Sequence, residues 1–205
     1  MRPIVNTYTV IASSSAGVCA SQTPAGAGEL TLDGSLISGG ILTLATPQHI
    51  SVSCAGSDAA KTFTVTGTDF IGAALSETIA GSAGSITNGT KNFKTVTSVT
   101  VSAATAGAVT VGVLGVLETP WIPLNVQITP FSYSYQVDIG TATFTVEGTL
   151  DNTQDNSITP TPFTVQSSGS ADVTGAATAP VMAVRVKVTA FTSGTITFRV
   201  LQAGI

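Results

Sequence analysis

Two similar stretches of alternating residues constrain the fold of this chain more than any other feature. Residues 61–69 read KTFTVTGTD, and residues 143–151 read TFTVEGTLD. Because successive side chains of a β-strand point to opposite faces, Phe63 and Val65 share one face, as do the matching residues of the second stretch. Threonine on the opposite face suits a pleated, half-exposed surface. The repeat predicts two similar sheets in series, one in each half of the chain.

Short candidate strands separated by glycine-rich turns fill most of the remaining sequence. They cover residues 4–12, 29–32, 40–44, 49–53, 61–67, 74–80, 91–101, 108–113, 126–129, 131–138, 141–150, 161–166, 183–189 and 195–201. Such short runs with frequent turn signals indicate a β-sandwich or barrel. No window has the helical period, so no helix is expected. The predicted fold class is all-β, with two Ig-like or jelly-roll-like β-sandwich domains in series and an N-terminal strand or arm.

Composition and proline content suggest the domain boundaries. Small residues dominate SSSAGVCASQTPAGAG, which indicates a flexible arm or a simple surface loop, and Pro120 and Pro123 interrupt regular pairing. The expected segments are an N-terminal strand and arm at 1–28, a first sandwich at 29–118, a proline-rich linker at 119–124 and a second sandwich at 125–205.

A low charge content bounds the class of partner. Only 9% of the residues are charged, against roughly 25% in an ordinary soluble protein. This low content favours a protein that works as a subunit of a larger assembly and forms a homo-oligomer. Seven Lys and Arg in a chain of net charge −4 argue against nucleic acid, because a phosphate-tracking strip needs clustered cations. Arg185, Lys187 and Arg199 are the nearest group, and their alternation indicates the solvent face of strands. The sequence has no apolar run of about 18 residues, so no membrane span is expected. Asn6 to Thr9 interrupt the apolar run that a signal peptide would need, so no signal peptide is expected.

Little in the sequence indicates catalysis or a cofactor. His49 is the single histidine, and no nucleophile or acid pattern accompanies it, so no catalytic residue, cofactor or metal is expected. Asp151, Asn152, Asp155 and Asn156 offer oxygen ligands for Ca²⁺, but their spacing favours an ordinary loop. Two cysteines without a CxxC pair favour buried free thiols over a disulfide.

Seven residues are candidates for interaction. Ile4, Val5, Tyr8 and Val10 lie on the first candidate strand, which could be added to a neighbouring subunit's sheet by β-augmentation. The single tryptophan, Trp121, either plugs an interface between the domains or forms an exposed anchor or sugar platform. Tyr133 and Tyr135 share one face of FSYSYQV and are the other candidate stacking platforms.

Several segments resemble virion structural proteins of tailed bacteriophages. The similarity lies in TFTVTGTD, ALSETIAG and FKTVTSVTVSAATAGAVTVGV, and then in VQITPFSYSYQV, FTVEGTLDN and APVMAVRVKVTAFTSGTITFRVLQAG. It spans residues 29–205 and leaves out the segment around Cys19. The resemblance implies a structural role in a phage particle and transfers no site residues.

The expectation from sequence is therefore a non-enzymatic virion protein, made in the bacterial cytoplasm and located in the particle. The favoured position is a capsid decoration or cement protein that clamps neighbouring copies of the major capsid protein or other virion proteins. A tail, collar or fibre-base component is the alternative, and a carbohydrate-binding module on the particle is a second alternative.

Overall fold

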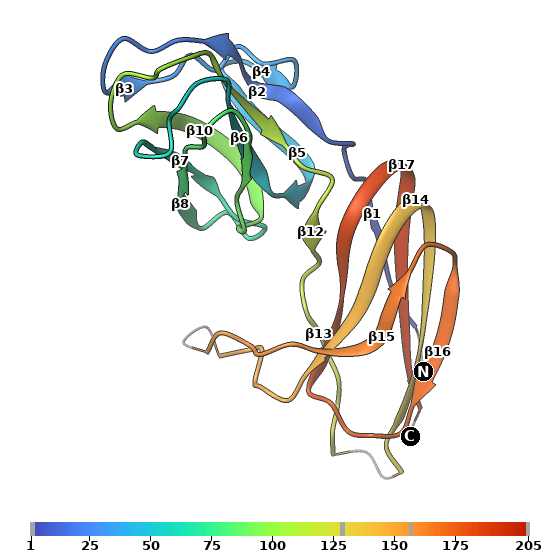
Figure 1. Ribbon diagram of the computed structural model, residues 1–205. Coiled ribbons are helices and arrows are strands. Elements are labelled where there is room, and N and C mark those ends of the chain that lie inside the picture. The colour runs from blue at the N-terminus through green and yellow to red at the C-terminus, as the bar shows by residue number, and fades with distance from the viewer. Residues whose placement is uncertain (1–2, 128–129, 156–157, 204–205) are drawn as a thin grey trace. The chain divides into compact units, whose positions relative to one another are not determined.

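The computed structural model describes residues 3–127, 130–155 and 158–203. All regular secondary structure within these ranges consists of β-strands. The chain therefore has the all-β, sandwich-type fold that the alternation predicts (Figure 1). The strands are β1 (Ile4–Tyr8), β2 (Ser14–Gln22), β3 (Gly28–Glu29), β4 (Ile37–Ser38), β5 (Ile41–Gln48), β6 (Ile50–Cys54), β7 (Thr62–Thr68), β8 (Ala74–Ala80), β9 (Ile86–Asn88), β10 (Phe93–Val101), β11 (Val109–Val113), β12 (Leu117–Glu118), β13 (Ile122–Pro123), β14 (Ser132–Thr149), β15 (Phe163–Gly169), β16 (Val173–Ala177) and β17 (Ala183–Ala203).

The chain divides into two compact units. One consists of residues Met1–Val10 and Glu118–Ile205 and is called the split unit below; the other, Ile11–Leu117, is called the inserted unit. The inserted unit interrupts the split unit in sequence, because β1 belongs with the strands that follow residue 117.

Two sheets enclose one core in the inserted unit. The six-stranded sheet has the order β4-β5-β10-β7-β8, with β3 also on β10, and the four-stranded sheet has the order β2-β11-β6-β9. Phe63 and Val65 of β7 are fully buried, as are Val52 of β6 and Val111 of β11 from the other sheet. All four belong to one apolar cluster, so the unit is a β-sandwich whose inward row is the one that alternation predicts.

A bulge interrupts the pairing of β7 with β10 at the glycine of the first repeat. The register shifts between Val96 and Ser98, opposite Gly67. A Cβ on Gly67 would lie 1.8 Å from the carbonyl oxygen of Thr95, so only glycine allows the two backbones to come this close. The sequence TGT therefore marks a local break in the ladder, as expected from its glycine.

Two long, bent strands form the centre of the split unit. β14 and β17 pair along their whole lengths, and Figure 1 shows both turning over at the same end of the unit. Before the bend β14 pairs with β16, and after it with β15; β17 pairs with β13 at its start and with β1 near its end. The seven strands of this sheet thereby make two layers that cover each other.

The bend occurs between the candidate strands 131–138 and 141–150 on β14, and between 183–189 and 195–201 on β17, where Gly140 and Ser193-Gly194 indicate hairpin turns in the sequence. Instead of two hairpins, both strands continue, and the register shifts between Ile139 and Thr141. A Cβ on Gly140 would lie 2.2 Å from the Ser193 carbonyl oxygen, and Gly194 has φ +98°. The Asp172 carboxylate accepts a hydrogen bond from the Ile139 N–H at 2.8 Å. Glycine on both strands thus permits a close crossing, and Asp172 fixes it.

Two expected segments and one candidate strand differ from the observed elements. Residues 14–22, expected in a flexible arm, form β2 and pair with β11, while β1 belongs to the split unit. The expected linker at 119–124 contains β13, which pairs with Val184 and Ala183 at the edge of the split unit's sheet, where proline is tolerated. The candidate strand at 126–129 lies partly outside the described residues, and Val126 and Gln127 form a turn.

Both cysteines are buried free thiols in the inserted unit, as expected. Cys19 lies opposite Val111 on one side of β11, and Cys54 lies opposite Val109 on the other side. Burial, and to a smaller extent the nearby Asp33 carboxylate, raise the pKa of Cys19 to about 12. The thiolate is therefore strongly disfavoured in the folded state.

This shift predicts that the inserted unit loses stability in base. The folded pKa of Cys19 lies above the usual value, so its contribution is complete below pH 9 and is lost as the pH rises from about 9 towards 12. One proton is involved, so the folding equilibrium constant should fall by up to about tenfold per pH unit in this window. Denaturant titrations of the wild type and of Cys19→Ala at several pH values measure it. An equal slope in the two proteins would contradict the assignment to Cys19.

Candidate interaction surfaces

The four candidate residues near the N-terminus divide into exposed and buried pairs. β1 pairs with β17 of its own chain, with Ile4 opposite Val200 and Tyr8 opposite Ile196. Ile4 and Val5 are 44% and 49% exposed, whereas Tyr8 and Val10 are buried. The structure therefore places β1 in the chain's own sheet, and only Ile4 and Val5 have surface available for a partner.

Tyr8 anchors β1 to the split unit. Its hydroxyl is hydrogen-bonded to the side chains of Thr119 and Asn6, and burial raises its pKa more than these bonds lower it. Thr119 in turn bonds β17 through both its main chain and its side chain, at 2.9 and 3.0 Å to Val186. Tyr8 thus links β1 to the segment on which the chain re-enters this unit.

Tyr133 and Tyr135 do share a face, but it is the inner face of the sheet. Both are buried, and their ring centroids lie 6.3 Å apart, with Phe131 in edge contact with Tyr133 at 6.0 Å. The Tyr135 hydroxyl donates to Gln166 Oε1 at 3.3 Å. Burial raises the pKa of both tyrosines. A sugar-stacking platform requires an exposed ring, so these two residues are core residues and the platform interpretation does not hold for them.

Trp121 is half-buried beside β13 and packs against a cation. The guanidinium carbon of Arg185 lies 4.5 Å from the ring centroid, and Arg185 Nε donates to Glu147 Oε2 at 2.7 Å. The stacked guanidinium covers one face of the indole, and such a contact stabilises by about 0.5–2 kcal/mol. Trp121 therefore has a structural partner within the split unit, and that face is not open to a sugar.

The three basic residues of β17 all have carboxylate partners. Besides Arg185, Lys187 Nζ lies 3.4 Å from Glu118 Oε1, and Arg199 pairs with Asp138. Arg185, Lys187 and Arg199 alternate with the buried valines and phenylalanine of the same strand, so they lie on the outward row as expected. Their charge is balanced locally, which leaves this surface close to neutral.

Hydrogen bonds hold the described part of the acidic loop after β14. Asp151 Oδ2 accepts from the Thr161 N–H at 2.6 Å, and Asn152 Oδ1 accepts from the Gln154 N–H at 3.1 Å. Asn156 lies outside the described residues. Among the residues that the structure describes, no three His, Cys, Asp or Glu side chains are grouped to hold a metal ion. Asn152 thus makes the local bond to its own backbone by which Asn favours turns, and Asp151 bonds a main-chain N–H further along the loop.

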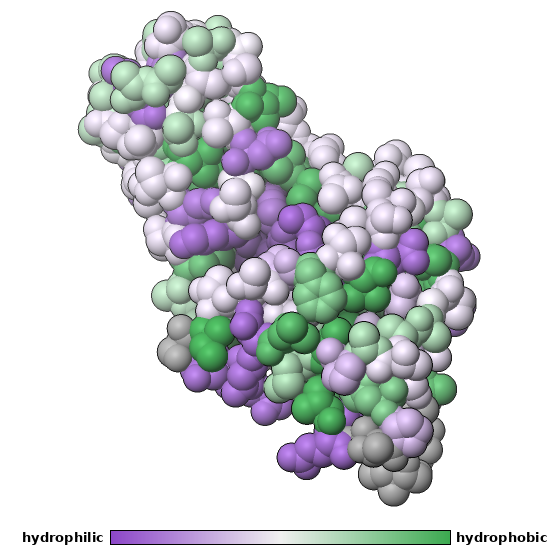
Figure 2. All heavy atoms as spheres, turned by 60° about the horizontal axis from the view of Figure 1, so that its bottom comes forward, coloured by the Kyte–Doolittle hydropathy of each residue, from purple (hydrophilic) through white to green (hydrophobic). Residues whose placement is uncertain are grey.

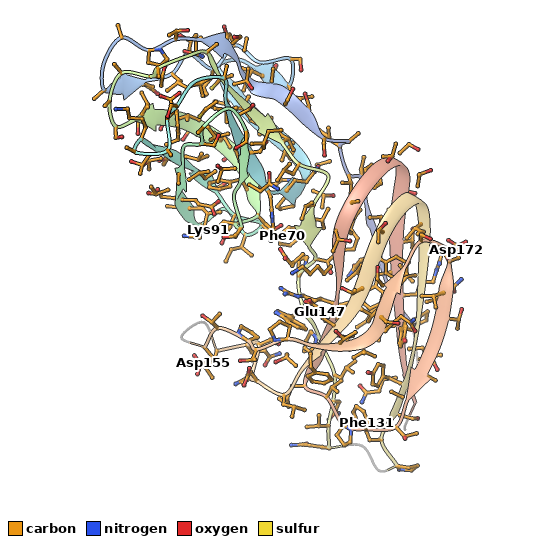
Figure 3. All side chains as sticks on the ribbon, viewed as in Figure 1. Phe70, Lys91, Phe131, Glu147, Asp155 and Asp172 are labelled. Carbon is orange, nitrogen blue, oxygen red and sulfur yellow. The ribbon has the colours of Figure 1, made fainter. Side chains whose placement is uncertain are left out.

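The hairpin between β7 and β8 presents an apolar tip that the sequence-based candidates did not include. Phe70 and Ile71 are 54% and 78% exposed, and Figure 3 shows Phe70 pointing away from the core. The Asp69 carboxylate accepts from the N–H groups of Ile71 and Ala73 at 3.0 and 2.9 Å, and Gly72 has φ +86°. The sequence Asp-Phe-Ile-Gly contains this signal: turn residues enclosing two large apolar side chains.

A second group of exposed apolar side chains lies at one end of the split unit. Leu150, Ile158 and Phe163 flank the turn held by Asp151, and each is exposed. Residues of intermediate hydropathy cover much of the face drawn in Figure 2, with hydrophilic and hydrophobic residues in smaller groups between them. Each unit therefore displays its own apolar contact point on a weakly charged surface.

Comparisons with protein families, curated proteins and solved structures give no match for this chain. The part of the chain that the structure describes contains no helix able to cross a membrane.

Proposed function

We propose that the protein is a non-enzymatic structural subunit of a tailed-phage particle, bound to the capsid as a decoration or cement protein that clamps neighbouring subunits. The apolar hairpin tip Asp69–Ala73, defined above, carries this proposal. The low charge of the chain and the resemblance of residues 29–205 to virion structural proteins support the choice of partner.

The tip is built to contact another surface. Exposed Phe and Ile side chains gain roughly 1.5–3 kcal/mol each when a partner fully buries them. Because Asp69 already holds the loop through two main-chain hydrogen bonds, binding loses little backbone entropy. A rigid apolar projection therefore suits insertion into a preformed apolar pocket of a capsid subunit.

Two contact points in one chain suit a repetitive lattice. The tip lies in the inserted unit, and Leu150 and Phe163 lie in the split unit. Linked weak contacts act together, since the second forms at the high effective concentration set by the first. Many copies on a capsid could thus reinforce it without a large interface for each contact.

Exchange of the tip residues should remove the protein from particles. We expect Phe70→Ser with Ile71→Ser to lower binding to particles lacking the protein by at least tenfold, because about 1.4 kcal/mol corresponds to tenfold. Ile86→Ser is the matched control, since Ile86 is an exposed apolar residue of the same unit, on β9. Co-sedimentation with particles measures occupancy. Equal occupancy of the double variant and the wild type would refute the role of the tip.

A further inference from the structure

The outer edge of β1 is open, and residues 3–10 carry no charged side chain that would oppose edge-to-edge pairing. In the described part of the chain, β1 pairs with β17 alone, so the N–H and C=O groups along its other side face outward. Residues 3–10 read PIVNTYTV, without a charged side chain. The single proline, Pro3, precedes the strand and leaves the strand itself able to pair.

Apolar side chains flank this open edge. Val5 lies opposite Arg199 on β17, and Leu201 lies two residues further along the same strand. Ile4, Val5 and Leu201 are each more than two-fifths exposed. Arg199, the charged side chain in register with Val5, is ion-paired with Asp138 on β14. The edge therefore combines unpaired backbone groups, exposed apolar side chains and a locally neutral surface.

We infer that β1 pairs antiparallel with β1 of a second copy of this chain and joins the two split units through one continuous sheet. An antiparallel pair related by a two-fold axis uses the same edge on both copies, so one surface is sufficient for a closed dimer. A neutral edge suits its own copy, because like charges would otherwise meet across the axis. An edge that binds a charged foreign strand would carry the opposite charge, and residues 3–10 carry none.

The contact between two β1 strands is small, so the dimer that it forms is weak. Five residues span about 17 Å, and two such strands bury less than the roughly 1,200 Å² of a stable interface. The dimer is therefore weak in dilute solution and becomes populated when copies are held close together. Trapping is a more sensitive test than size alone.

Cysteine trapping can report this contact because both native thiols are buried. Val5→Cys and Thr7→Cys each introduce one exposed thiol on β1, Asn6→Cys introduces a half-buried one between them, and Thr174→Cys places an exposed thiol on β16, at the opposite edge of the same sheet. In a two-fold antiparallel pair one position near the axis lies opposite its own counterpart. We expect at least one β1 variant to form an intermolecular disulfide, under oxidised glutathione, at least tenfold faster than Thr174→Cys.

A charged substitution at the edge of β1 provides a second test. Val5→Lys should abolish the concentration-dependent dimer in sedimentation velocity, whereas Val5→Thr should retain it; far-UV circular dichroism checks that both variants fold. If none of the β1 variants forms the intermolecular disulfide faster than Thr174→Cys does, the inference is overturned. Purified protein without particles is used, so a negative result leaves the proposed function untouched.

Discussion

Deletion of residues 3–10 is expected to unfold the split unit and to leave the inserted unit folded. The deletion removes all five pairs between β1 and β17 and the buried side chains of Tyr8 and Val10. Loss of one buried aromatic side chain alone costs about 3–5 kcal/mol, and a whole domain is stable by only about 5–15 kcal/mol. It also uncovers the edge of β17 beside Ile196 and Phe198, which are otherwise fully buried.

The sequence places independent reporters in the two units. Trp121 and all three tyrosines lie in the split unit, and both cysteines lie in the inserted unit. We expect the deletion to shift tryptophan emission to the unfolded wavelength and to abolish the near-ultraviolet dichroism of Tyr133 and Tyr135, the two tyrosines that it leaves. Both thiols should stay protected from Ellman's reagent. Tyr8→Phe is the mild control, since it keeps the ring and loses only the hydroxyl bonds, at about 1 kcal/mol. Native tryptophan emission after the deletion would show that β1 is dispensable.

Replacement of Gln48 by methionine is expected to destabilise the inserted unit severely. Gln48 is fully buried; its Oε1 accepts from the Ile11 N–H at 2.8 Å, and its Nε2 donates to the carbonyls of Ile11 and Leu114 at 2.8 and 2.6 Å. Methionine fills a similar volume but leaves these three backbone groups without their partner. At about 1–3 kcal/mol for each unsatisfied group, the loss expected for the three groups together is about 3–9 kcal/mol.

Gln22 offers a matched control for that prediction. Its side chain makes the same two-bond contact with the main chain of Thr31, at 3.0 Å for each bond, on an exposed surface. Water can replace those bonds, so Gln22→Met should cost under about 1 kcal/mol. Denaturant titration followed by thiol accessibility measures both variants. Equal losses in the two variants would show that burial does not set the cost.

Local alternation predicted the strands that bury one regular row of large side chains. The strands around Phe63 and Phe144 follow this rule, and Ala74–Ala80 agrees with β8 at both ends. β2 and β16 were missed because glycine, alanine and serine dominate them, although Val18 and Cys19 of β2 are fully buried. Small residues give no hydrophobic period even where they pack tightly against a sheet.

Pairing between distant strands could not be predicted from local pattern. β1 pairs with β17, from which almost the whole length of the chain separates it. The local pattern of residues 4–8 does not predict that pairing. Alternation likewise shows that Tyr133 and Tyr135 share a face but not that this face is the inner one. The sequence Asp-Phe-Ile-Gly indicates a turn at Phe70 and Ile71, but the exposure of these two side chains depends on where β7 and β8 end.

The copy number of the protein in purified particles tests the central claim most directly. Quantitative mass spectrometry against the major capsid protein measures it in purified phage particles. The proposal predicts one copy per capsid subunit or a simple fraction of that number. A few copies per particle would assign the protein to the tail or collar instead, and its absence from particles would contradict the structural role altogether.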